Sequence, residues 1–71
     1  MKLIFHDGQF FAPSRIVSMK LNGSKWHIVG DGGSFFVSLD AKADKETLEA
    51  VIKSLSIVNK ESIIKKWQSK Q

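Results

Sequence analysis

The chain contains no cysteine, a single proline and a single arginine. Without cysteine it can form neither disulfides nor cysteine-based zinc sites, which are the usual supports of very small domains. The core must therefore come from its own Phe, Trp, Ile, Leu and Val residues or from a partner subunit. No apolar run approaches the ~20 residues of a membrane span, and the amino terminus reaches a charged turn at Asp7 too early to hold a signal-peptide core. We expect a cytoplasmic protein without a membrane span.

The length of 71 residues allows one domain, residues 1–71. A chain this short buries only about 60% of the surface that its unfolded form exposes, so its stability is expected to be small. Its content of 42% hydrophobic and 25% charged residues is typical of a globular domain. The net charge of +4 favours acidic partners. The excess is lysine, however, whereas nucleic-acid readers depend on the bidentate guanidinium of arginine, so basicity alone does not define the partner.

A first hairpin is predicted near the amino terminus. Asp7-Gly8 suits a type I′ turn, because both central residues of such a turn need positive φ. The flanking strands are expected at 2–6 and 9–11. Pro13 then ends the hairpin, since proline donates no ladder hydrogen bond.

Two consecutive hairpins are predicted after Pro13. Asn22-Gly23 is the strongest short-range hairpin signal in the chain and joins strands expected at 15–21 and 24–29. Gly32-Gly33 forms the next loop and leads into a strand at 34–39. The two loops fix a register, and the register assigns every side chain to one face of the sheet.

The predicted register separates an apolar inner face from a mixed outer face. The inner face collects the large apolar side chains Val17, Met19, Leu21, Trp26, Ile28, Phe35, Val37 and Leu39. The outer face carries three cross-strand rows, which are Ile16, Val29 and Phe36; Ser18, His27 and Ser38; and Lys20, Lys25 and Asp40. Lys20 directly opposite Lys25 is unfavourable unless Asp40 or an anion lies between the two ammonium groups.

After Asp40 the hydrophobic period changes from two to 3.6 residues. A helix is predicted at 44–55, with Asp44 as its N-cap and with an apolar stripe formed by Leu48, Val51, Ile52 and Leu55. This stripe is the expected cover of the inner face. The order of strands and then helices predicts an α+β fold, namely an antiparallel meander of four to five short strands packed on one face by this helix.

A second helix is predicted at the carboxy terminus, with Asn59 as its N-cap. Val58 and Ile63 are placed to form a hydrophobic staple, although one bent helix would satisfy nearly the same pattern. The segment combines apolar and basic side chains, which are Ile63, Ile64 and Trp67 with Lys65, Lys66 and Lys70. We expect its apolar stripe to dock on the domain with the lysines in water, while a membrane surface or an acidic groove is the alternative.

The sequence carries no catalytic signature and no metal-ligand spacing. The loop 30–34 is glycine-rich but contains an acid, leads into a strand and lacks the lysine of a P-loop, so it is interpreted as a turn and not as a phosphate cradle. His6 and His27 lack a third ligand at a recognisable spacing. We therefore expect no enzymatic activity, no metal and no cofactor.

The predicted function is protein binding through the outer face, with a second copy of the chain as one such partner. The expected contact residues are Ile16, Val29, Phe36, His27, Lys20 and Lys25. Single-stranded nucleic acid is the alternative ligand of the same face, because Phe36 and His27 could stack on bases while the lysines follow phosphates. A further alternative is that the first hairpin folds over Ile16, Val29 and Phe36 and makes a second small core.

Overall fold

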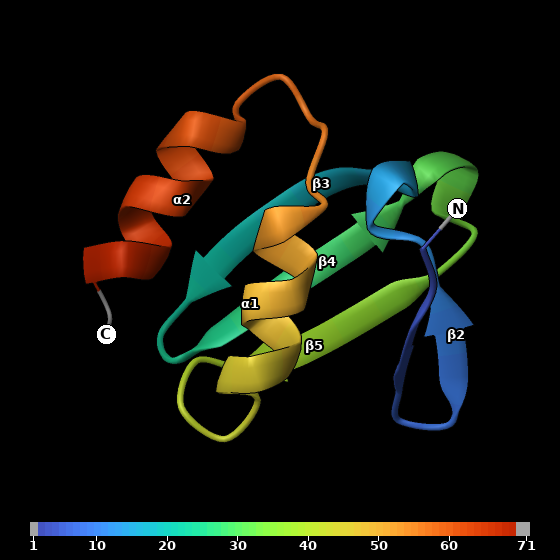
Figure 1. The fold of residues 1–71 in the computed structure, drawn as a ribbon, viewed down its shortest axis with the longest axis horizontal. Coiled ribbons are helices and arrows are strands. Elements are labelled where there is room, and N and C mark those ends of the chain that lie inside the picture. Colours follow the sequence, from blue (N-terminus) through green and yellow to red (C-terminus); the bar gives the residue numbers. More distant parts are fainter. Residues whose placement is uncertain (1, 70–71) are drawn as a thin grey trace.

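The computed structural model describes residues 2–69 of the chain (Figure 1). Its strands and helices are β1 (Ile4–His6), β2 (Gln9–Phe11), β3 (Ile16–Asn22), β4 (Lys25–Gly30), β5 (Phe36–Asp40), α1 (Lys45–Lys53) and α2 (Lys60–Ser69). The strands form two antiparallel sheets, β1-β2 and β3-β4-β5. The prediction of an α+β fold with antiparallel strands is confirmed, although the strands divide between two sheets instead of continuing through one meander.

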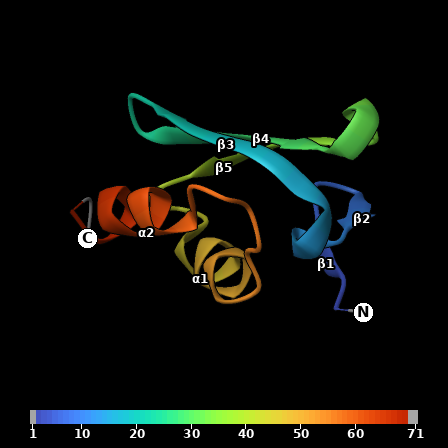
Figure 2. The ribbon, with the colours of Figure 1, turned by 90° about the horizontal axis from the view of Figure 1, so that it is seen from above.

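The helices and the first hairpin lie on the same side of the three-stranded sheet, which is the inner face (Figure 2). The side chains buried between these layers form the core, which consists of Phe11, Ile16, Met19, Trp26, Ile28, Val37, Leu39, Leu48, Val51, Ile52, Leu55 and Ile63. The opposite side of the sheet is the outer face. No element of residues 2–69 covers it.

Two of the three predicted turns form as expected. Asp7 and Gly8 both have positive φ, 52° and 78°, which is the type I′ pattern. In the third hairpin β4 and β5 pair in the predicted register, with Val29 opposite Phe36 and Ile28 opposite Val37. The amide of Ser34 donates to the carbonyl of Asp31 across Gly32-Gly33 at 3.0 Å.

The turn of the middle hairpin lies one residue later than predicted. Asn22 pairs with Lys25, so the loop residues are Gly23 and Ser24. Gly23 has a φ of 64°, and a glycine with positive φ at the first loop position is typical of a type II′ turn. The correction moves the β3 residues from Ser18 to Leu21 by two positions along β4. A shift of two keeps every side chain on its face, which is why the predicted faces survive beyond this turn.

A β-bulge between Ile16 and Ser18 reverses the alternation at the start of β3. An extra residue in one strand puts its neighbour on the other face. Ile16 is therefore buried, with 2% of its surface exposed, and Val17 is 56% exposed. The predictions that Ile16 lies on the outer face and that Val17 lies on the inner face are both wrong.

The first hairpin packs on the inner side of the sheet and not over the outer face. Phe11 anchors it, because this ring is buried and its centroid lies 5.3 Å from that of Phe35. The chain reaches this position through a 3-10 turn at Pro13–Arg15, which separates β2 from β3. The alternative in which the hairpin covers Val29 and Phe36 is therefore wrong.

Two separate helices follow the sheet. α1 begins after Asp44, as predicted, and ends at Lys53, before the buried Leu55. The Asp44 carboxylate does not cap α1, because its Oδ2 accepts the amide of Asp40 at 2.8 Å. α2 starts after Asn59, and its Ile63 is buried while Ile64 and Trp67 are half-buried against the core.

The hydrophobic staple predicted for the second helix does not form, since the Val58 side chain is fully exposed. Lys70 lies outside the described residues.

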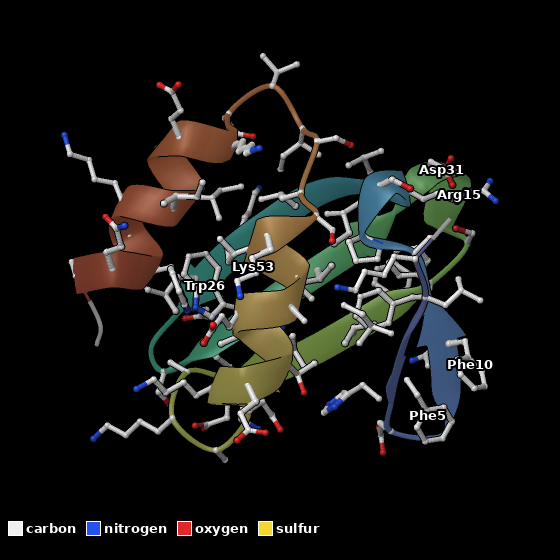
Figure 3. The ribbon with its side chains drawn as sticks, in the orientation of Figure 1. Phe5, Phe10, Arg15, Trp26, Asp31 and Lys53 are labelled. Atoms are coloured by element: carbon white, nitrogen blue, oxygen red, sulfur yellow. The ribbon has the colours of Figure 1, made fainter. Side chains whose placement is uncertain are left out.

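Trp26 is fully buried on the inner face, and Figure 3 shows it in the region framed by α1 and α2. Its indole Nε1 has no acceptor among residues 2–69. A buried donor without a partner costs about 1–3 kcal/mol, so Trp26 stabilises the core through its area and not through a hydrogen bond.

Candidate interaction face

The outer face is a small open surface of three cross-strand rows. From one end of the sheet to the other, the rows are Ser18, Val29 and Phe36; Lys20, His27 and Ser38; and Asn22, Lys25 and Asp40. Five of the six predicted contact residues lie on it, which are Val29, Phe36, His27, Lys20 and Lys25. Ile16 does not, because the bulge turns it into the core.

The first row is the apolar end of the face. Phe36 is 69% exposed, and its cross-strand neighbour Val29 is partly buried. Val17 is a second exposed apolar side chain, at the same end of β3. The backbone at Phe36 is fixed from outside the sheet, because Gln9 donates its Nε2 hydrogen to the Phe36 carbonyl at 3.1 Å. The exposed Phe36 ring thus lies on a strand that is also hydrogen-bonded to the first hairpin.

The middle row is polar. His27 Nδ1 lies 3.3 Å from the Ser38 hydroxyl across β4 and β5, and Lys20 stands opposite His27 on β3. The prediction that Lys20 lies opposite Lys25 is wrong, because the later turn shifts the pairing by two positions. The like-charge repulsion expected between directly opposed lysines is therefore absent from this register.

The third row ends at Asp40, whose carboxylate already accepts two hydrogen bonds. Asp40 Oδ1 accepts the amides of Lys42 and Ala43 at 2.8 and 2.9 Å. The Ala43 and Lys42 amides, followed by the positive charges of Lys25 and Lys42, hold the pKa of Asp40 below its usual value of 3.8. Asp40 thus stabilises the turn that leads from β5 to α1 as well as lying beside Lys25.

The lysines of the outer face have no ion-pair partner within residues 2–69. The charged pairs closer than 4.0 Å in that range are Arg15 with Asp31 at 3.2 Å and Lys53 with Glu49 at 3.3 Å, and neither includes Lys20 or Lys25. Two exposed lysines on adjacent strands therefore face solvent, Lys20 in the row next to the apolar row and Lys25 at the opposite end of the face.

The edges of the three-stranded sheet are less accessible than its outer face. Gln9 blocks the β5 edge at Phe36, and the Asp44 carboxylate blocks it at Asp40. At the other edge of the sheet, α2 contacts β3. Addition of a partner strand needs open backbone groups, and side chains already bind two of them on the β5 edge.

Sequence reasoning missed one exposed surface. Phe5 and Phe10 are paired across the first hairpin with their centroids 4.8 Å apart, and both project away from the domain (Figure 3). A shallow hollow of about 250 Å³ beside them is lined partly by Leu3, Phe10 and Phe35. The Asp7-Gly8 register already predicts Phe5 opposite Phe10, so the pairing was accessible from the sequence, whereas the side on which the hairpin docks was not.

Within residues 2–69, no three His, Asp or Glu side chains are grouped so that they could hold a metal ion. Within the same range, no helix has the length and apolar character needed to cross a membrane. The fold and the face together define a small α+β domain with an open sheet surface. No protein-family model, curated protein or solved structure matches the chain.

Proposed function

We propose that this chain is a non-enzymatic binding module that contacts another protein through the outer face, with Phe36 as the anchor. The observation that carries the proposal is the exposure of Phe36 on a paired strand, at a face that no described element covers. Covering a Phe side chain contributes about 1.5–3 kcal/mol, and aromatic side chains are enriched among the residues that dominate protein interfaces. Val17 and Val29 extend the apolar contact.

Protein is favoured over single-stranded nucleic acid by the composition of the face. Sequence-tolerant binders of single strands stack successive bases on several aromatic rings. The outer face has one phenyl ring, Phe36, and one imidazole ring, His27, and Lys25 lies at the end opposite Phe36, beside Asp40. A base stacked on Phe36 would leave its phosphates without a continuous row of cations.

The test starts from a photo-crosslinking residue placed at position 36, with position 5 as the matched control. Phe5 and Phe36 are both exposed phenylalanines, at 59% and 69%, on different surfaces. A protein captured only from position 36 is then purified and titrated into the labelled chain. We expect amide shifts centred on Val29 and Phe36, loss of binding in Phe36→Ser and retention in Phe5→Ser.

Two results would overturn the proposal. The first is a purified partner whose shifts map to the Phe5–Phe10 surface or whose binding survives Phe36→Ser. The second is that position 36 crosslinks nucleic acid and no protein. Light scattering at high concentration shows whether the partner is a second copy, in which case Phe36→Ser must return the mass to that of a monomer.

A further inference from the structure

We infer that the partner of the outer face is an acidic protein surface whose carboxylates pair with Lys20 and Lys25; this inference rests on the proposed function. Both lysines are exposed on adjacent strands of the face, and neither has a carboxylate within 4.0 Å in residues 2–69. Asp40 is the one carboxylate in the three rows, and two backbone amides already occupy its Oδ1. With two lysines and one carboxylate, the three rows still carry a net positive charge, and Lys20 lies in the row next to the apolar one.

The arrangement sets the shape of a complementary surface. Val29, His27 and Lys25 point outward from the same strand, and the strand positions of Val29 and Lys25 are four residues apart, or ~13 Å at the usual rise of a strand. A matching partner places an apolar side chain on Phe36 and carboxylates about 7–13 Å away along β4. Because the two ends of the face differ in character, only one docking direction satisfies both of them.

A second copy of this chain does not supply the missing charge. Its outer face brings the same two lysines and the same engaged Asp40, and each copy carries a net charge of +4. Lys20 and Lys25 raise the rate at which an acidic partner associates and fix its orientation. The apolar contact at Phe36 supplies most of the affinity.

The experiment selects ligands without a known partner. A random-peptide phage library is panned on the immobilised chain, with immobilised Phe36→Ser as the counter-selection. We expect enriched peptides that combine an aromatic or aliphatic residue with Asp or Glu. The most enriched peptide is synthesised and titrated into the wild-type chain and into two charge-matched double variants, Lys20→Gln/Lys25→Gln on the outer face and Lys60→Gln/Lys65→Gln on α2.

We expect the outer-face double variant to bind the peptide about three- to tenfold more weakly at low salt, and the α2 variant to change binding by less than about twofold. The difference should shrink at about 0.5 M salt, where exposed charges are screened. All four lysines are exposed, so both variants are expected to fold. Neutral or basic enriched peptides, absence of enrichment, or equal weakening in the two variants would each overturn the inference.

The outcomes also separate the inference from the proposed function. Peptides that need Phe36 but are indifferent to Lys20 and Lys25 leave the proposed function standing and refute the acidic partner. Peptides that bind Phe36→Ser as well as wild type refute the proposed function itself. A 12-mer of oligothymidine, titrated in parallel, refutes the acidic protein partner if it binds more tightly than the peptide and shifts the amides of Lys20 and Lys25.

Discussion

The two faces of the three-stranded sheet are built from the same strands, but one face is buried and the other is exposed. On the inner face Trp26, Ile28 and Leu39 are buried under the helices and the first hairpin. On the outer face Phe36 stays exposed, because no described element is left to cover it. The difference teaches that strand alternation assigns residues to faces, whereas the helices and the hairpin decide which face is buried. The apolar residues of the outer face should therefore be dispensable for folding, which makes the comparison testable.

The largest expected difference is between two residues of β5. Leu39 is fully buried, so Leu39→Ala should lower the free energy of unfolding by about 2–5 kcal/mol, through lost apolar contact and the cavity that remains. Phe36→Ser should change it by no more than about 0.5 kcal/mol, as is usual for surface positions. Urea titrations followed by tryptophan fluorescence measure both. Comparable losses in the two variants would show that the outer face is covered in solution.

The bulge gives the second comparison, within two consecutive residues. Ile16→Ala should cost about 2 kcal/mol, since Ile16 is in the core, and Val17→Ala should cost less than about 0.5 kcal/mol. Unbroken alternation would give the reverse order. The same urea titrations decide between them, and a larger cost at Val17 would contradict the bulge.

Ile16 and Val17 also show which part of the fold could not be predicted from the sequence. Glycine-containing turns carry a local signal, so the three hairpins and most of both faces follow from the positions of Gly8, Gly23 and Gly33. The bulge carries no such signal, because Ile16 and Val17 are both β-branched apolar residues and either can occupy the core. The turn at Asn22-Gly23 lies one residue later than predicted. This shift leaves the β3 residues beyond the bulge on their predicted faces, but it places Lys20 opposite His27 instead of Lys25.

The residues of the outer face could be predicted from a local pattern, but the exposure of that face could not. Val29, Phe36 and His27 follow from the period of two in β4 and β5. Where the first hairpin docks depends on how the 3-10 turn at Pro13–Arg15 directs the chain and on the contact of Phe11 with Phe35. Such contacts join residues far apart in the sequence, and periodicity does not encode them.

A third prediction sharpens the comparison at Gly30, an inner-face position without a side chain. A Cβ placed there would collide with the Phe35 ring, although the Gly30 φ of −85° is ordinary. Gly30→Ala should therefore cost about 1–3 kcal/mol, the usual range for inserting a methyl group into a packed region. Ser38→Ala on the outer face is the control and should cost about 0.5 kcal/mol or less. An unchanged urea midpoint in Gly30→Ala would mean that Phe35 moves aside freely.

The smallest expected effect concerns Asp40, which lies on the outer face and still contributes to the fold. Its pKa is held down in the native state by the Ala43 and Lys42 amides and by nearby lysines, so the charged carboxylate adds stability at neutral pH. A lowered native pKa means that this contribution is present above the unfolded pKa and is lost as the pH falls through the native one. Asp40→Asn should accordingly lower the urea midpoint at about pH 7, with a difference that shrinks toward about pH 3. Asp40→Ala, which also removes the acceptor of both amides, should keep a deficit at either pH. A difference between wild type and Asp40→Asn that did not vary with pH would show that Asp40 acts through its hydrogen bonds and not through its charge.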